Sequence, residues 1–352
     1  MLLRTDHFEG LSSYEVPKNE VKSNGCFTVL DVKRAAHENL CDDALRHLKQ
    51  DLADHLYENS NDIPASTEND IAGNFVAVTI PDCIPSRLGL LTRFVSLAFL
   101  HNDAKSAGTA SLKDNKTLND QFTGGLSEAL PTLDATHQTP LRHVKPPANR
   151  GRPRRTVENV IRPIINDLLT QDHIMGLEVL DAWRKHYNNL TLKTPSGTPS
   201  ATTLDDHLRN CLQMFPSTFW SITLRYALGL HLNETELSLL APVLDSAVRC
   251  IVLTTDYWSW PKDAQSADNN KRLSNAVAVS MAERCCSATE ALEAVKIAAI
   301  AAEGEFAKCK KTVIQLAGEG QSEVVMFLEA LQQFVAGNSL WCSTCPRLRV
   351  RR

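Results

Sequence analysis

The feature that most constrains this chain is an apolar run at residues 90–100 that ends abruptly in a polar stretch. At 3.6 residues per turn, Val95 and Phe99 share one face of a helix. Asn102 and Ser106 continue that face to the point where the chain has become polar. The run therefore predicts a buried helix whose apolar wall leads up to a polar rim, which is how a deep pocket is lined.

A second polar cluster lies at residues 255–263. Thr255, Ser259 and Asp263 follow one another at i, i+4 spacing, so a helix would stack three oxygen-bearing side chains along one face. Lys262 lies beside them in the sequence. We expect this face to meet the polar rim of the first helix across the mouth of the pocket.

Composition sets the broad class of the protein. The chain has 352 residues, of which 43% are hydrophobic, enough for one large core, so we expect one domain over residues 1–352. The net charge of −4 predicts no general attraction to nucleic acid or to an anionic membrane. Ten cysteines without a signal peptide indicate reduced thiols, and no apolar run approaches the ~20 residues of a membrane span. We expect a soluble, cytoplasmic protein with no membrane partner, and a homodimer is left open.

Helical periodicity also appears at residues 31–57 and 157–187. Between the pocket helix and the second of these, residues 104–156 are rich in Ser, Thr, Gly, Asn and Pro and have no apolar period. A segment of this length without periodicity is uncommon in a compact domain unless it is flexible or functional. We predict a flexible loop or a lid, because it follows directly on the polar rim.

A basic motif, RGRPRR, occupies residues 150–155 of that loop. It resembles the Arg-Gly-Arg-Pro core of AT-hooks, whose arginines enter a narrow minor groove. DNA binding, a basic anchor over an anionic pocket mouth and a solvated charged loop are all open interpretations. Because the motif is short and the protein is acidic, we favour the solvated loop and expect no nucleic-acid partner.

Several blocks of the chain resemble a known family. The sequence PDCIPSRL at residues 81–88, the helix after it, the cluster at 255–263 and the tail SLWCSTCPR at 339–347 are similar to the cyclase domain of fungal class I terpene synthases of the fusicoccadiene and sesterterpene type. The resemblance runs from about residue 14 to 347. It implies an all-α, single-domain class I terpene cyclase bundle around a central apolar cavity, and a function in terpenoid biosynthesis.

The resemblance also implies a metal site. In that family an aspartate-rich D-D-x-x-D/E motif and an N-D-x-x-S-x-x-x-E motif hold three magnesium ions, which draw diphosphate off a prenyl substrate. Asn102, Asp103 and Ser106 stand at the first motif, where only Asp103 remains acidic. Magnesium prefers carboxylate and other hard oxygen ligands, so these replacements remove what it binds best.

The second motif keeps more of its pattern. Thr255 stands in place of the leading Asn and Asp263 in place of the closing Glu, whereas Ser259 and Lys262 are retained. If a metal is bound, the resemblance implies as its ligands Asp103, Thr255, Ser259 and Asp263.

Two further diphosphate-handling elements also differ. Where the family has an Arg followed by an Asp, this chain has Cys211 and Met214, although a shifted alignment would use Arg209 instead. In the tail, Arg347 is followed by Leu348 rather than by the family's Tyr. With the pocket wall and the motif residues, the expected substrate-binding set is Val95, Phe99, Ser106, Cys211, Asp263, Trp341 and Arg347.

These changes touch every element that handles diphosphate. A cavity can still accelerate ring closure without metal, by holding reacting ends together and by donating hydrogen bonds to an oxygen that gains charge. We therefore favour a metal-independent cyclase or pericyclase, for example an intramolecular Diels–Alder reaction of an oxidised terpenoid, with no cofactor. The expected catalytic residues are Asn102, Asp103, Thr255, Ser259 and Lys262. The alternative is a Mg²⁺-dependent synthase acting on geranylgeranyl or a related diphosphate, and a non-catalytic terpenoid-binding protein is a further one.

Overall fold

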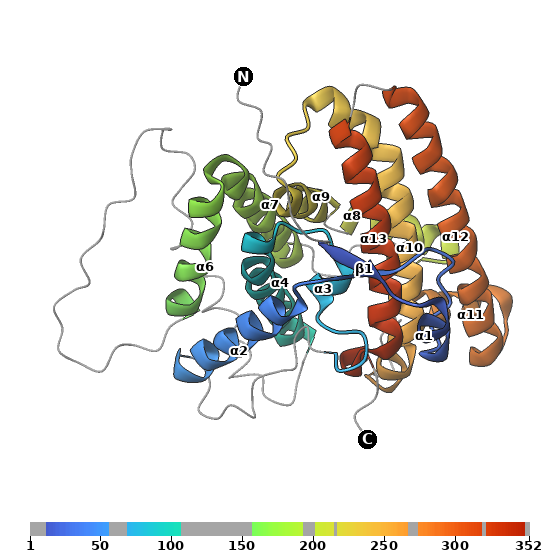
Figure 1. Cartoon of the computed structure of the whole chain (residues 1–352). Coiled ribbons are helices and arrows are strands. Elements are labelled where there is room, and N and C mark those ends of the chain that lie inside the picture. The colour runs from blue at the N-terminus through green and yellow to red at the C-terminus, as the bar shows by residue number, and fades with distance from the viewer. Residues whose placement is uncertain are drawn as a thin grey trace.

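The computed structural model describes residues 12–55, 69–106, 157–192, 201–214, 217–266, 274–318 and 322–348, without the side chains of residues 101–106, 157–158, 186–192, 214 and 266. It is a helical bundle with one small antiparallel sheet (Figure 1). In the sheet, β1 (Ser13–Glu15) pairs with β2 (Lys33–Ala35). The helices are α1 (Lys18–Ser23), α2 (Glu38–His55), α3 (Phe75–Thr79), α4 (Pro85–Ser106), α6 (Val157–Gln171), α7 (His173–Leu192), α8 (Leu204–Met214), α9 (Ser217–Leu228), α10 (Glu234–Ser266), α11 (Ala276–Arg284), α12 (Ala288–Ala317) and α13 (Ser322–Thr344), followed by the 3₁₀ turn η3 (Pro346–Leu348).

Two groups of helices form the bundle, and α3 lies between them. On one side α10 packs along α12 and α13, and on the other α2, α4, α6 and α7 pack in sequence (Figure 1). Gly337 of α13 makes the central contact possible, because a Cβ there would lie 1.9 Å from the carbonyl oxygen of Val78 at the end of α3. The close approach of α13 to α3 therefore requires glycine at this position.

Local sequence signals explain where several helices begin. Ser287 and Glu290 form a capping box at the start of α12, each side chain accepting a hydrogen bond from the other residue's backbone N–H. Asn275 caps α11 by accepting from the backbone N–H of Val277. Because Asn275 is fixed in this way, its side-chain amide is held against the neighbouring helix α10.

The predicted buried helix is confirmed as α4, in which Leu91, Phe94 and Val95 are fully buried, whereas the pocket that it would line stays a prediction. The helix predicted at residues 31–57 was set too early, since it begins only at Glu38. The reason is a tertiary contact, because residues 33–35 pair with β1 instead of joining the helix.

The helical stretch predicted at residues 157–187 is divided into α6 and α7. The break falls at Asp172, whose carboxylate accepts a hydrogen bond from the backbone N–H of Met175 near the start of α7. The loop predicted at residues 104–156 was set to begin too early, since α4 continues to Ser106. The rest of it, residues 107–156, lies outside the described residues. The lid, with its basic segment at 150–155, stays a prediction.

The expectation that no apolar stretch approaches membrane-spanning length was wrong for α10. Its segment Glu234–Gln265 is long and apolar enough to cross a membrane by length and composition alone. Half of the apolar window is buried inside the protein, where α10 packs against α12 and α13. A core helix of a bundle has this character, so its apolar composition is explained by packing.

Candidate active site

The second predicted cluster lies on α10, and two of its three oxygen-bearing side chains meet there. The Ser259 hydroxyl donates to Oδ2 of Asp263 at 2.6 Å, as their i, i+4 spacing predicts. From α11, the Asn275 amide donates to the same Oδ2 at 3.0 Å and approaches the Ser259 hydroxyl at 3.4 Å. Ser259 is buried and Asp263 half-buried, so these oxygens lie at the edge of the protein interior.

Asp256, which follows Thr255 in the α10 motif, forms an ion pair with a buried histidine. Its Oδ2 lies 2.7 Å from Nε2 of His207 on α8 and also accepts from the backbone N–H of Ala276 at 2.7 Å. Burial is the largest single effect on His207 and lowers its pKa, but the hydrogen bonds and charge interactions with Asp256 and Cys211 together outweigh it and raise the pKa to about 10. The imidazole is therefore protonated at neutral pH, and the pair ties α8 and α11 to α10.

Cys211 is drawn into the same contact. Its thiol lies 3.6 Å from Nε2 of His207, on the next turn of α8. The residue that the resemblance places at the family's diphosphate-sensing Arg thus lies beside a buried cation, although it carries no charge of its own. Lys262 is half-buried on α10.

Thr255 faces a different neighbour from Ser259. Its hydroxyl lies 3.9 Å from the thiol of Cys342 on α13, and that thiol donates to Oδ1 of Asn338 at 3.6 Å. A chain of three polar side chains therefore runs from the α10 motif into the buried face of α13.

An aromatic cluster fills the centre of the bundle beside this chain. Phe75 of α3 is its hub, with ring centroids 5.0 to 6.0 Å from four other rings. The four rings come from α4, α9 and α13, so the helices from both groups meet here. They are Phe99, Trp220, Phe334 and Trp341.

The end of α13 contacts both α4 and α10. Trp341 stacks on Phe99 of α4 at 5.9 Å, while the next residue, Cys342, contacts Thr255 of α10. The guanidinium of Arg347 lies over the Phe99 ring at 4.7 Å. Of the predicted substrate-binding side chains, Phe99, Trp341 and Arg347 therefore lie together, and Val95 is buried one turn before Phe99.

The polar rim of the first motif lies on the last turns of α4. Asn102, Asp103 and Ser106 belong to that helix, but their side chains lie outside the described part of the structure. Their roles stay predictions, as does the expectation that they face the α10 motif across a mouth.

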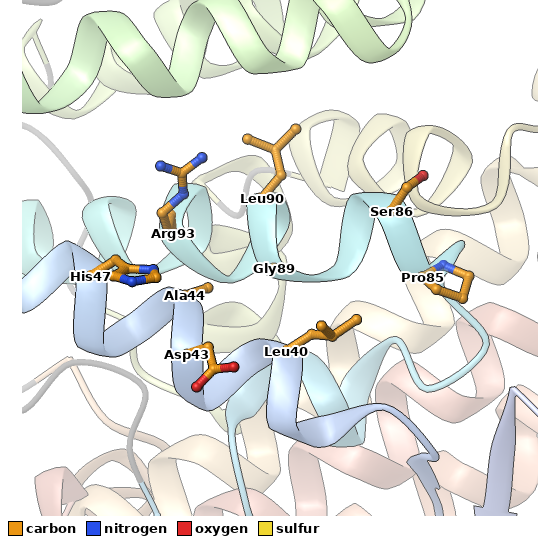
Figure 2. A pocket seen from close by; sticks show the side chains of 9 residues that line it. All are labelled: Leu40, Asp43, Ala44, His47, Pro85, Ser86, Gly89, Leu90 and Arg93. Atoms are coloured by element: carbon orange, nitrogen blue, oxygen red, sulfur yellow. The ribbon is translucent and has the colours of Figure 1, made fainter.

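A groove of about 580 Å³ lies elsewhere, on the outer face of α2 and α4. Figure 2 shows Arg93, Leu90 and Ser86 projecting from α4 beside the α2 residues His47 and Asp43. It shares no lining residue with the α10 motif or with the aromatic cluster, and it was not predicted from the sequence.

Sequence reasoning missed several residues at this centre. Asp256 lies within the predicted cluster but outside its i, i+4 series, so the spacing does not single it out. The sequence does contain a signal for His207, since a lone His one turn before Cys211 is a candidate partner for a carboxylate. The sequence contains no signal for Asn275, because its contact with Asp263 depends on how α11 packs against α10.

The implied metal can be tested against this donor set. Magnesium is commonly held by one or two carboxylates together with substrate phosphates and waters. Asp263 supplies one carboxylate oxygen, and Ser259 and Thr255 supply hydroxyls on the same helix. Within the described residues, no group of three His, Cys, Asp or Glu side chains converges. In their chemistry, the Ser259 and Asp263 oxygens are ligands of the kind that magnesium prefers.

Comparisons with known proteins identify similar sequences and a shared fold. The family described as "Terpene synthase family 2, C-terminal metal binding" matches residues 129–300. The bifunctional terpene synthase FUP1 of Fusarium proliferatum (strain ET1) is 26% identical over 95% of this chain and 42% of its own length. Preterpestacin I synthase tpcA of Cochliobolus heterostrophus is 25% identical over 94% of this chain and 44% of its own. The chain thus spans less than half the length of these curated relatives.

Solved structures share the fold. Aristolochene synthase from Penicillium roqueforti superposes with a TM-score of 0.62 at 13% identity, over 86% of this chain and 94% of the other. For α-eudesmol synthase the TM-score is 0.62 at 17% identity, over 91% and 98% of the two chains. These likenesses show the all-α class I terpene cyclase fold. Together with the family match over residues 129–300 and the fungal relatives, they support a place for the chain among the fungal class I terpene synthases.

Proposed function

We propose that this protein is a Mg²⁺-dependent class I terpene cyclase that ionises and cyclises a prenyl diphosphate, geranylgeranyl or one of related size. Its likeness to terpene synthases already indicates a terpene cyclase-like enzyme of terpenoid biosynthesis. The finer proposal rests on one observation: the Ser259–Asp263 pair of α10 presents a carboxylate and a hydroxyl at one point, with Thr255 one turn earlier. This reverses the order of preference drawn from the sequence, because the relatives support the metal-dependent alternative better.

The residues divide the chemical work between them. Magnesium held by Thr255, Ser259 and Asp263 would supply a Lewis acid for the departing diphosphate. Asn275 fixes the rotamer of Asp263 by donating to its Oδ2. The ion pair of His207 and Asp256 holds α8 and α11 against α10, so the motif keeps its shape while the leaving group's charge develops.

The aromatic cluster serves the hydrocarbon part of the substrate. Faces of Phe and Trp rings attract a cation and exclude water, which is what a reactive carbocation needs. Phe99 and Trp341 belong to this cluster, and Trp341 directly precedes Cys342, whose thiol contacts Thr255. The ring-lined interior and the α10 oxygens are thus neighbours.

The direct test is release of pyrophosphate from C15, C20 and C25 prenyl diphosphates by the purified protein. We expect release and a cyclic product with at least one of the three in Mg²⁺, and neither without it. A protein that binds the diphosphates but leaves all three intact in Mg²⁺ would contradict the proposal.

A metal-independent cyclisation of a neutral, oxidised terpenoid is the second candidate. It is favoured by the way the Asn275 amide already occupies Asp263 and Ser259, which leaves the motif hydrogen-bonded within itself. The replacements at Asn102 and Thr255 point the same way, because amides and hydroxyls suit a carbonyl better than they suit Mg²⁺. Turnover that persists after chelation of metals would identify this reaction.

A further inference from the structure

One polar side chain lies inside the apolar face of α13. Phe334, Asn338 and Trp341 follow one another at i, i+4 and i, i+7 spacing, so they share a face. Phe334 and Trp341 both contact the ring of Phe75. Asn338, which is 5% exposed, therefore lies within the wall that carries the aromatic cluster.

The oxygen and the nitrogen of the Asn338 side-chain amide differ in their hydrogen bonding. Its Oδ1 accepts from the thiol of Cys342, which in turn lies 3.9 Å from the Thr255 hydroxyl. Its Nδ2 is buried and has no hydrogen-bond partner among the described residues. The thiol fixes the orientation of the amide, so the unpaired N–H groups are directed away from Cys342.

A buried amide donor without a partner is rare in native proteins, because the group loses water and gains nothing in return. An apolar residue of similar volume would fill the same space in a purely structural role without this loss. The unpaired donor is the kind of group that a site uses to recognise a ligand oxygen, as buried polar groups in other sites discriminate for their partners.

We propose that Asn338 donates a hydrogen bond through Nδ2 to an oxygen atom of the terpenoid bound at the aromatic cluster, or to a water molecule held with it, and so selects oxygen-bearing ligands. The proposal rests on the proposed function only in that the cluster binds a terpenoid. Asn338 then acts as a specificity residue, and the chain through Cys342 to Thr255 couples its orientation to the α10 motif.

Binding of three matched ligands tests the proposal without any need for catalysis. The ligands are geranylgeraniol, its methyl ether and the hydrocarbon that lacks the oxygen. Binding of each is measured by the quenching of tryptophan fluorescence, to which Trp220 and Trp341 of the cluster contribute. Because the ether can only accept, a protein donor predicts that alcohol and ether both bind at least about fivefold more tightly than the hydrocarbon. Equal affinity of the wild-type protein for all three ligands would overturn the proposal, even if no variant could be prepared.

Two variants localise the effect. Asn338→Leu should remove the preference for oxygen and leave affinity for the hydrocarbon within about twofold of wild type, since volume is nearly kept. Gln332→Leu is the control, because Gln332 is also an amide on α13. Its partner, Lys310, belongs to α12, so Gln332 faces α12 and not the cluster. A preference that survives in Asn338→Leu, or is lost equally in Gln332→Leu, would refute the assignment.

Labelled water separates the two sources of the oxygen atom. If the wild-type protein forms a terpenoid alcohol in H₂¹⁸O, incorporated label that is lost in Asn338→Leu assigns the bound oxygen to water. An unlabelled oxygen, with a product that still changes in Asn338→Leu, assigns it to the substrate. The same products in the same ratio from Asn338→Leu and wild type would contradict the proposal.

Discussion

The α10 motif and the aromatic cluster lie side by side, yet the carboxylates of the motif and the Asn338 amide in the cluster wall are satisfied in opposite ways. Asp256 and Asp263 each accept hydrogen bonds from two groups. In the wall of the cluster, the amide nitrogen of Asn338 has no partner among the described residues. The carboxylates are hydrogen-bonded within the protein, whereas the Asn338 amide can still donate to a ligand.

This difference separates two demands on a cyclase. The shape of the protein interior depends on many contacts, so the packed rings of α3, α4, α9 and α13 maintain it even where single residues vary. Charge balance at a metal depends on a few oxygens, and here Asp263 supplies a carboxylate, whereas Asn102 and Ser106 stand where the resemblance implies acidic residues.

The largest expected effect breaks the cluster itself. Phe75→Ala should lower the free energy of unfolding by about 3–5 kcal/mol, because Phe75 is 3% exposed and contacts four rings. Urea denaturation measures the change. Phe27→Ala is the control, since Phe27 is half-buried and, among the described aromatic residues, contacts the rings of Tyr257 and Trp258. Equal losses in the two variants would deny the cluster its central role.

A second change strikes the motif without touching the cluster. Asp263→Asn should slow Mg²⁺-dependent turnover by about a hundredfold or more, roughly 2.7 kcal/mol of barrier, because the only carboxylate of the Thr255–Ser259–Asp263 set is lost. Steady-state pyrophosphate release measures it. Asp245→Asn, an exposed position on the same helix, should leave the rate unchanged. Full activity in Asp263→Asn would show that the metal does not bind at the α10 motif.

The buried ion pair predicts a pH dependence of stability. The pKa of His207 is raised in the folded protein, so its contribution is complete below 6.5 and is lost as pH rises through about 10. We expect the free energy of unfolding to fall by roughly 2 kcal/mol across that window, a value typical of a hydrogen bond to a charged group. In His207→Gln this part of the decline should vanish. An identical pH profile in both proteins would show that Asp256 does not hold the imidazolium.

The smallest effect concerns the residue that competes with a metal. Asn275→Asp keeps a good helix cap but puts a second carboxylate against Asp263, so the protein should lose about 1 kcal/mol of stability without Mg²⁺. Added Mg²⁺ should restore that loss, because a cation that binds only the folded state stabilises it. Thermal unfolding with and without the ion measures both terms. A loss that Mg²⁺ leaves unchanged would place the ion elsewhere.

How far the sequence predicts this molecule depends on the distance over which each signal acts. The pocket helix and the Ser259–Asp263 pair follow from helical spacing, which is local, and both are found in the structure. The strand at residues 33–35 was taken for helix because its partner is 20 residues away, beyond any local period. The pairing of His207 with Asp256 and of Asn275 with Asp263 depends on how α8 and α11 pack on α10, which no spacing encodes.

The central claim is that the reaction begins with a metal-bound diphosphate, and chelation tests it most directly. The wild-type protein is incubated in EDTA and then in excess Mg²⁺ with the prenyl diphosphate it accepts, and with a neutral, oxidised terpenoid of the same carbon number. We predict no cyclic product from either compound in EDTA and full recovery with the diphosphate alone once Mg²⁺ is restored. Cyclisation of the neutral terpenoid that continues undiminished in EDTA would contradict the account and establish the metal-independent reaction in its place.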